Sequence, residues 1–339
     1  MTAKNREETV VNFLKGTKWE NAKRKNQSAD CSCRRYEYLS LPNETAILMD
    51  CPHSEPIGPF SDVAKILTNL GYTVPTIYKE DRDEQLALVE YLAGTDFDKL
   101  EGKSFEIAMH KGIDLLVDLH KRFDEKKLDV WLPDYRYSDQ WYMFWDDLFP
   151  VWGMTEISKE QGGNFEERFD YPPNKILKQW RDIWHELHNE SDKSKTSLML
   201  LDYHTPNLKY IPYKEGLKQV GLLDFQDAVI GPCAYDVVSL IEDARKTVEK
   251  PLQKDLLNHY IKDSNISDYQ EFLKSFTIMS ARRNLRNIGS WYRFKKAKND
   301  TTHFECVKRH WFYLQESLQQ PVLKDLYELV KPFTPEGFK

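Results

Sequence analysis

The sequence predicts an α+β protein in which a small antiparallel sheet comes first and a larger, mainly helical part follows. Short apolar runs of strand-like composition, bounded by turn residues, fall before residue 92. After that point, long segments carry apolar residues at the spacing of an amphipathic helix. A chain of 339 residues can form one large or two small domains. We therefore expect an N-terminal part over residues 1–92 and a C-terminal part over residues 93–339.

The N-terminal part begins with helical spacing over residues 7–14, and a polar connector then runs to Gln27. Residues 36–39 and 46–49 have the composition of two strands, and the segment 41–44 between them contains turn residues. We expect these two strands to pair through that turn.

A second helix and a third strand follow. Residues 60–70 have apolar side chains at helical spacing, and Gly71 then supplies a common C-terminal stop. Residues 86–92, with the sequence LALVEYL, predict a strand that leads into Gly94.

The C-terminal part is predicted to be mostly helical. Its segments with helical spacing are 105–123, 141–152, 176–188, 234–244, 252–262, 269–296 and 303–318. His120 lies within the first of them, where a packed or capping histidine is expected rather than a catalyst. Gly231 and Pro232 predict a loop that opens the helix at 234.

Composition excludes several classes of protein. A net charge of −6 and a pI of about 5.9 argue against a nucleic-acid-binding protein. No apolar run approaches the length of a membrane span, and the N-terminus lacks the apolar core of a signal peptide, so we expect a cytoplasmic protein without a membrane partner. The cysteines have no zinc-site spacing and are expected to be reduced thiols: Cys31, Cys33, Cys51, Cys233 and Cys306.

The most informative stretch begins with the apolar run 198–201, which predicts a short buried strand or turn. Asp202 follows this run, and Asn207 lies five residues later. A second apolar run, residues 220–223, ends in an Asp-Phe pair at Asp224. This layout is typical of a phosphotransferase site.

The chemistry explains the layout. Phosphoryl transfer needs a base on the acceptor hydroxyl, here Asp202, and hard oxygen ligands for magnesium, here Asn207 and Asp224. The alternative is a loop Asp and Asn that only make turn hydrogen bonds. The Asp-Phe pair at the expected distance argues against that alternative.

Residues 198–243 resemble the aminoglycoside phosphotransferase family, which shares the bilobal protein-kinase-like fold. The continuation LLDFQDAVIGPCAYDVVSLIEDAR is most similar to a bacterial branch of anomeric sugar kinases that phosphorylate N-acetylmuramate and N-acetylglucosamine at C1. Three further stretches resemble that branch: SADCSCRRYEYLS near Ser28, AILMDCP near Ala46 and ARRNLRNIGSWYR near Ala281.

The resemblance implies an N-terminal nucleotide-binding lobe and a C-terminal catalytic lobe that also binds the acceptor. It implies the cofactors ATP and Mg2+, a small-molecule sugar as the partner, and a role in cell-wall sugar recycling. The oligomeric state stays open. Two alternatives remain: a kinase of another small alcohol or an aminoglycoside, and a catalytically inactive nucleotide-binding module.

The resemblance places a phosphate-covering loop at residues 28–35, which contain no glycine. Ser32 and backbone amides would meet phosphate oxygens there, and Arg34 or Arg35 would neutralise their charge. Two arginines on a solvated strand edge are the alternative.

Kinases of this fold usually pair a lysine on the following strand with a glutamate on the next helix. Here the strand ends in Asp50 and the helix carries Lys65, so we expect a reversed pair in which Asp50 steadies Lys65 near the phosphates. A solvent-facing Lys65 is the alternative. The adenine edge is expected to meet the backbone at Val89, Glu90 and Tyr91, unless these residues form a plain edge strand.

Asp236 is expected to brace the loop of Asp202, since Leu200 stands where many members of the family have a histidine. Asp227 and Asp243 are candidate substrate contacts; solvated carboxylates are the alternative for both.

The late helices carry many basic residues, namely Arg282, Arg283, Arg286, Arg293, Lys295, Lys296, Lys298, Lys308 and Arg309. Such a basic wall would repel a polycationic aminoglycoside but not a neutral or carboxylated sugar. Arg283 is therefore a candidate acceptor ligand, and Trp291 is a candidate face for a sugar ring. Charges in solvent and aromatic side chains in the core are the alternative.

Overall fold

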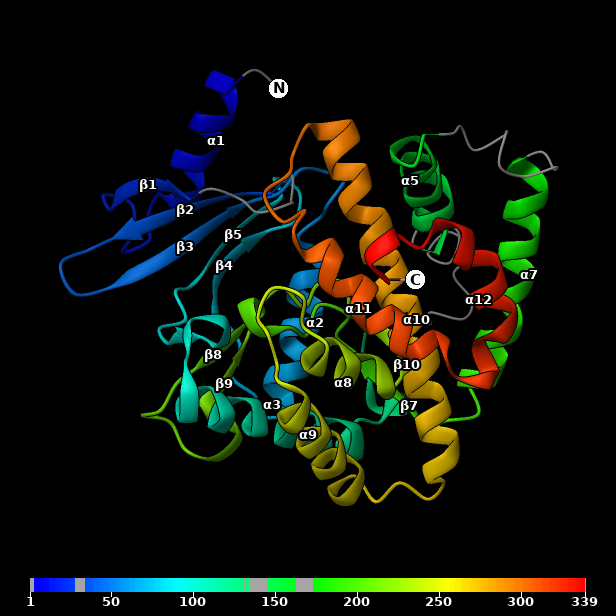
Figure 1. Ribbon diagram of the computed structural model, residues 1–339. Helices are drawn as coiled ribbons and strands as arrows, with labels where there is room; N and C mark the ends of the chain where they lie inside the picture. Colours follow the sequence, from blue (N-terminus) through cyan, green and yellow to red (C-terminus); the bar gives the residue numbers. More distant parts are fainter. Residues whose placement is uncertain (1–2, 28–33, 131, 134–145, 163–172, 339) are drawn as a thin grey trace. The chain divides into compact units, whose positions relative to one another are not determined.

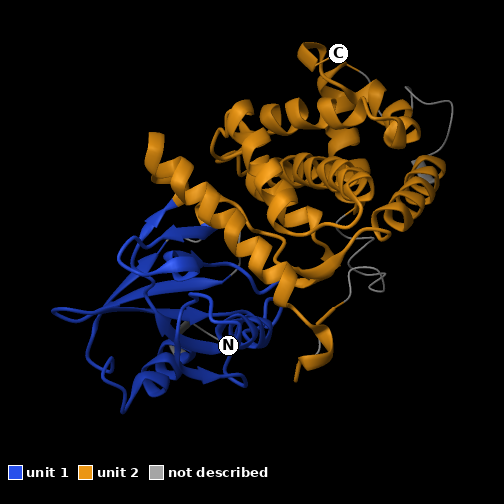
Figure 2. Cartoon of the chain, turned by 90° about the horizontal axis from the view of Figure 1, so that it is seen from below, with its two compact units in different colours: residues 1–96, 207–227 blue, residues 97–206, 228–339 orange. Residues whose placement is uncertain are grey.

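The computed structural model describes all residues except 1–2, 28–33, 131, 134–145, 163–172 and 339. The chain forms two compact units (Figure 2). Unit 1 contains residues 1–96 and 207–227, and unit 2 contains residues 97–206 and 228–339. The segment 207–227, which the sequence places in the C-terminal part, therefore belongs to unit 1.

A five-stranded antiparallel sheet forms the centre of unit 1 (Figure 1). Its strands, in spatial order, are β1 (Lys23–Gln27), β2 (Arg35–Ser40), β3 (Thr45–Asp50), β5 (Leu86–Glu90) and β4 (Ile77–Asp81). Because β5 lies between β3 and β4, the alternative of an edge strand at residues 86–92 is wrong. β1 lies in the segment predicted as a polar connector, where the sequence KRKNQ gives no apolar alternation.

The two faces of this sheet carry different side chains. One face and the helix α1 (Ala3–Leu14) share a buried core that consists of Val10, Phe13, Leu14, Trp19, Leu39, Ala46, Leu48, Leu86 and Leu88. Side chains alternate along a strand, so the residues between these point to the other face. That second face carries Tyr36 opposite Met49, and Tyr38 opposite Ile47.

The helix α2 (Gly58–Asn69) follows β3 and agrees with the predicted helix. Gly71 has a φ of +87°, the left-handed conformation that glycine adopts at a helix end. The ring of Phe60 stacks on that of Phe225, with centroids 5.1 Å apart. Unit 1 is completed by a three-stranded sheet of β6 (Thr95–Asp96), β8 (Leu208–Tyr210) and β9 (Val220–Leu222).

Unit 2 is mainly helical (Figure 1). Its described helices include α3 (Gly102–Arg122), α5 (Met154–Glu160), α7 (Pro173–Ser191), α8 (Ala234–Ile241), α9 (Lys250–Asp263), α10 (Tyr269–Arg293), α11 (Cys306–Leu318) and α12 (Lys324–Val330). Residues 141–145 of the helix predicted at 141–152 lie outside the described residues, and a π-helix spans Phe149–Gly153. Within the described part of the chain, no helix is both long and apolar enough to cross a membrane.

Unit 2 also contains a two-stranded antiparallel sheet, and one of its strands ends three residues before Asp202. It consists of β7 (Thr196–Met199) and β10 (Val229–Pro232). The loop predicted at Gly231 and Pro232 is wrong, because both residues belong to β10. Pro232 ends that strand, a position where the missing N–H of proline is tolerated.

Candidate active site

Asp202 follows β7 in unit 2, after a residue with unusual backbone geometry. Leu201 is buried and has a φ of +67°, which non-glycine residues rarely adopt. The carboxylate of Asp236, at the start of α8, accepts hydrogen bonds from the backbone N–H groups of Leu200 at 2.6 Å and Leu201 at 3.0 Å. Asp236 therefore fixes the backbone immediately before Asp202.

Asp236 is fully buried. Burial raises its pKa to about 7, although the two N–H groups that it binds lower it. The cost of burying this carboxylate is offset because both of its oxygens have donors.

A second buried carboxylate holds the other end of the same loop. Thr205 begins a 3-10 turn that ends at Asn207. Asp243 accepts hydrogen bonds from the backbone N–H of Thr205 at 2.8 Å and from its hydroxyl at 2.5 Å. Asp243 is 1% exposed, so the expectation of a solvated carboxylate or a substrate contact is wrong. It braces the loop after Asp202, as Asp236 does before it.

The residues between the two braces are packed as well. Tyr203 is buried and donates a hydrogen bond from its hydroxyl to the carbonyl of Gly112 at 2.8 Å. Burial lowers the pKa of His204 to about 4, against the attraction of Asp243 and Asp202. His204 is therefore neutral near pH 7. Asp202 is partly exposed in the middle of a loop that is anchored on both sides.

Asn207 and Asp224 lie together in unit 1. The amide nitrogen of Asn207 is 3.2 Å from a carboxylate oxygen of Asp224, and the backbone N–H of Leu223 donates to the carbonyl of Asn207 at 2.9 Å. Gln226 donates to the other Asp224 oxygen at 2.8 Å. Asp224 is exposed and has a φ of +56°, which Asp tolerates better than most residues.

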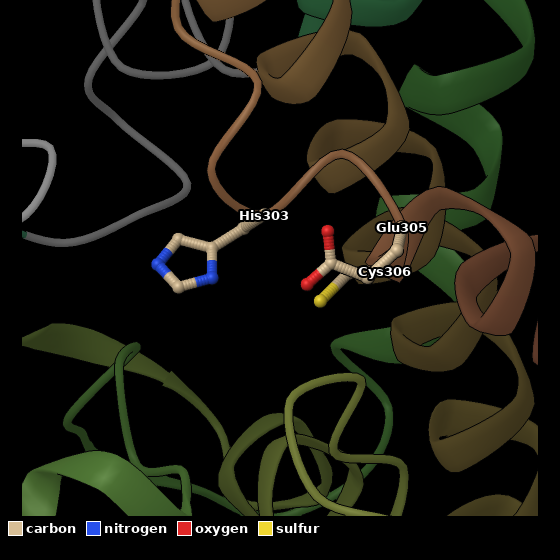
Figure 3. A group of neighbouring side chains, drawn as sticks. All are labelled: His303, Glu305 and Cys306. Carbon is tan, nitrogen blue, oxygen red and sulfur yellow. The ribbon is translucent and has the colours of Figure 1, made fainter.

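This pair offers hard oxygen atoms of the kind that magnesium prefers. A second group of metal-ligand types lies in unit 2, where atoms of His303, Glu305 and Cys306 are all within 4.8 Å of one another (Figure 3). Proximity of three ligand types does not by itself make a metal site, so we assign no metal to that group.

The family model for the phosphotransferase enzyme family matches residues 28–272. The chain belongs to this family. Among its relatives, the N-acetylmuramate/N-acetylglucosamine kinase of Caulobacter vibrioides is 25% identical over 97% of this chain and 97% of its own length. The enzyme of the same name from Pseudomonas aeruginosa is 27% identical over 91% of this chain and 88% of its own.

Solved structures show the same fold for this phosphotransferase. Aminoglycoside phosphotransferase APH(2'')-Ib, with ADP bound, has a TM-score of 0.58 at 13% identity and covers 93% of this chain and 97% of its own. A choline kinase from Streptococcus pneumoniae has a TM-score of 0.58 at 11% identity, over 93% of this chain and 100% of its own. The predicted kinase-like fold class is confirmed.

The candidate nucleotide residues of the phosphotransferase have different environments. Ser32 lies outside the described residues. Arg34 is buried, whereas Arg35 is exposed and pairs with Asp50. Lys65 lies on the exposed part of α2. Asp50 is bonded to Arg6 and Arg35 rather than to Lys65, so the expected reversed pair is wrong.

The candidate adenine-binding residues lie at the end of β5. Val89 is buried opposite Ile47, and the Glu90 carboxylate accepts from the N–H and hydroxyl of Thr76 at 3.1 and 2.7 Å. Tyr91 is exposed, and its ring meets that of Tyr38 edge to face. The pairing of β5 with β3 ends at Glu90, so the peptide groups that follow Glu90 are not paired with β3.

The basic wall expected on the late helices is partly internal. Arg282 is buried and pairs with Asp146 at 2.9 Å. Arg283 is buried and donates to the hydroxyl of Ser239 at 3.0 Å. The alternative of charges in solvent is therefore wrong for these two arginines, and Arg283 as an acceptor ligand stays a prediction.

The other two candidate acceptor contacts lie in different units. Trp291, in unit 2, is partly exposed, and the Arg245 guanidinium lies 5.8 Å from its ring centre. Asp227, in unit 1, is partly exposed, and its charge helps to raise the pKa of Arg34.

The structure gives specific neighbours to two residues that the sequence did not assign to the site, Arg286 and Tyr36. Arg286 donates to the hydroxyl of Tyr235 at 3.0 Å; burial opposes its charge, but Tyr235 and Asp202 raise its pKa. In unit 1, burial and the charge of Asp224 raise the pKa of Tyr36 to about 12. Spacing along the chain cannot reveal the neighbours of Arg286 or Tyr36, because those neighbours lie on other helices, strands or loops.

Proposed function

We propose that this chain is an ATP- and magnesium-dependent kinase that phosphorylates the anomeric hydroxyl of N-acetylmuramate or N-acetylglucosamine. The observation that carries the proposal is the approach of Asn207 to Asp224, 17 residues apart in sequence and 3.2 Å apart in space. Asp202 precedes Asn207 by five residues, on a loop with two buried braces. These three residues would supply a base and two metal ligands for phosphoryl transfer.

Asp202 is the proposed base. Its carboxylate would accept the proton of the acceptor hydroxyl as the hydroxyl oxygen attacks the terminal phosphorus of ATP. An anomeric hydroxyl is more acidic than an ordinary alcohol, so a carboxylate suffices. Neutral His204 beside it would leave the negative charge of Asp202 available for this step.

Asn207 and Asp224 are the proposed magnesium ligands. The Asp224 carboxylate would bind the ion directly, and half a turn of the Asn207 amide would present its oxygen to the same place. When bound, the ion would neutralise charge on the nucleotide phosphates. The exposure of Asp224 is consistent with this role, since a ligand must reach the incoming nucleotide.

The acceptor follows from the relatives, two of which carry the name N-acetylmuramate/N-acetylglucosamine kinase over most of both chains. In unit 2, Arg286 lies close enough to Asp202 for their charges to interact, and its guanidinium is held by Tyr235. A guanidinium beside the base would bind oxygen atoms of the sugar.

The proposal is tested by measuring ATP consumption with N-acetylmuramate, N-acetylglucosamine, choline and kanamycin as separate acceptors. NMR of the product would locate the phosphate. We expect turnover of one or both N-acetyl sugars, with phosphate on C1. Efficient turnover of choline or kanamycin alone would identify another kinase of small alcohols, and turnover of none of them would favour an inactive nucleotide-binding module.

A further inference from the structure

The carbonyl of Leu201, the residue before Asp202, has a buried partner on α8. The Ser239 hydroxyl donates a hydrogen bond to this carbonyl at 3.4 Å. Asp236, which accepts from the N–H of Leu201 at 3.0 Å, lies three residues before Ser239 on the same helix. Residues three apart lie on one face of a helix. One face of α8 therefore binds both backbone polar groups of Leu201.

The backbone at Leu201 needs this support, because it forms an unusually tight turn. The N–H of Asp202 donates to the carbonyl of Leu200 at 2.8 Å, and Leu201 between them has a φ of +67°. A three-residue turn with a positive φ at its centre is rare and strained. A peptide group is planar, so the carbonyl of Leu201 turns together with the N–H and Cα of Asp202. Holding that carbonyl therefore restricts the direction in which the Asp202 side chain leaves the backbone.

Arg283 of α10 determines what the Ser239 hydroxyl can donate to. Its Nε donates to the Ser239 oxygen at 3.0 Å. A guanidinium has donors only, whereas a hydroxyl can accept while its single hydrogen points elsewhere. Ser239 therefore accepts from Arg283 and keeps its hydrogen for the Leu201 carbonyl. The order of donation runs from Arg283 through Ser239 to Leu201, and we call it the α8 relay.

Arg283 is also held by the end of the same helix. Its Nη1 donates to the carbonyl of Glu242, the residue after α8, at 3.4 Å. Arg283 and Ser239 are both buried, and a buried guanidinium is costly unless acceptors surround it. A clamp between α10 and α8 is the simpler role for these contacts, but a clamp alone would not affect the loop of Asp202.

We propose that Arg283 and Ser239 are positioning residues for Asp202. Arg283 orients the Ser239 hydroxyl, and that hydroxyl holds the peptide group between Leu201 and Asp202. The inference rests on the proposed function, because it takes Asp202 as the base. The Asp202 carboxylate must come within hydrogen-bond reach of the acceptor hydroxyl, and a misplacement of about 1 Å can lower a rate by about 100-fold.

This role differs from the acceptor contact that the sequence predicts for Arg283. Removing a residue that binds the sugar raises the KM of the sugar, whereas removing a residue that aligns the base lowers kcat. The two kinetic constants therefore distinguish a positioning residue from an acceptor ligand.

The test measures kcat and the KM of N-acetylglucosamine and N-acetylmuramate for Ser239→Ala, Arg283→Met and the double variant. We expect kcat to fall by about 5- to 50-fold in each single variant, with each KM within about threefold of the parent. The double variant should lose about as much as either single variant, because both changes break one relay. The control Ser275→Ala removes another buried hydroxyl, which bonds to that of Ser191 at 2.7 Å, and should keep kcat within about twofold of the parent.

A raised KM at unchanged kcat would make Arg283 an acceptor ligand and overturn the proposal. Losses that multiply in the double variant would also overturn it, as would a loss in Ser275→Ala as large as that in Ser239→Ala. If Arg283→Met does not fold, the comparison of Ser239→Ala with Ser275→Ala decides alone.

Hydrogen exchange separates this inference from the proposed function. The exchange rates of the Leu201 and Asp202 N–H groups should rise at least about tenfold in Ser239→Ala but not in Ser275→Ala, because only the first change frees the turn. Unchanged exchange in Ser239→Ala would overturn the positioning role even in an active enzyme. A parent protein that phosphorylates neither sugar would contradict the function, and the exchange rates would then decide whether the α8 relay holds the loop.

Discussion

The carboxylate of Asp236 accepts a 3.0 Å hydrogen bond from the backbone N–H of Leu201, a buried leucine with a φ of +67°. A left-handed conformation costs a residue such as leucine about 1–2 kcal/mol. Asp236 offsets that cost through this bond and a second one to Leu200. The position of Asp202, one residue further on, thus depends on the start of α8.

Replacing Asp236 by alanine is expected to destabilise the protein strongly. The change leaves the buried N–H groups of Leu200 and Leu201 without their acceptor, at about 1–3 kcal/mol each. Urea denaturation should show a loss of about 2–5 kcal/mol, whereas Asp182→Ala, at an exposed site on α7, should stay within about 0.5 kcal/mol. A loss of equal size in the two variants would contradict the brace.

Replacing Asp202 by asparagine is expected to remove the proposed base while the fold remains. Phosphorylation of the best acceptor should fall by about 100-fold or more, because a positioned base acts in the transition state. ATP affinity, measured by calorimetry, should change by less than about threefold. Asp182→Asn is the control, and turnover of Asp202→Asn within a few-fold of the parent would exclude Asp202 as the base.

The proposed role of Asp224 as a magnesium ligand is tested by replacing it with asparagine. Asp224→Asn keeps a side chain that tolerates the φ of +56° but loses the charge that would bind the ion. Activity should then need a higher magnesium concentration and be at least about tenfold lower at saturation. Activity is measured as a function of added magnesium, with Asp83→Asn, on an exposed turn of unit 1, as the control. Activity that survives a chelator in the parent would rule out this role.

The buried Glu242 carboxylate lets us predict how the stability of the fold depends on pH. Burial raises the pKa of this carboxylate from 4.5 to about 7, although Ser280 and Asn284 hydrogen-bond to it. Between these values the folded protein holds a proton that the unfolded chain releases, so stability falls as the pH rises through about 7. Asp236, with a pKa of about 7, contributes in the same direction.

Glu242→Gln should therefore lose less stability than the parent between pH 5.5 and pH 8, because glutamine keeps an acceptor oxygen but does not titrate. Urea denaturation at both pH values measures the difference. The control Glu328→Gln, on the exposed side of α12, should follow the parent. A Glu242→Gln variant with the full pH dependence of the parent would show that the effect arises elsewhere.

The sequence by itself determined the elements with strong periodicity and the chemistry of the site. Apolar spacing predicted α2 and α10 nearly to their ends, because each buries one face against a core. Residue type and separation singled out Asp202, Asn207 and Asp224, since the loop that carries the first two is short. These are local properties of the chain.

Only the tertiary structure decided which carboxylates and arginines have which partners. Asp243 is polar in the sequence, yet it is buried beside Thr205, which lies 38 residues earlier. Arg34 and Arg35 are chemically identical, yet Arg34 is buried and Arg35 is exposed beside Asp50. The reason is physical: composition fixes what a side chain can bind, whereas strand register and helix packing fix which groups come within reach of it.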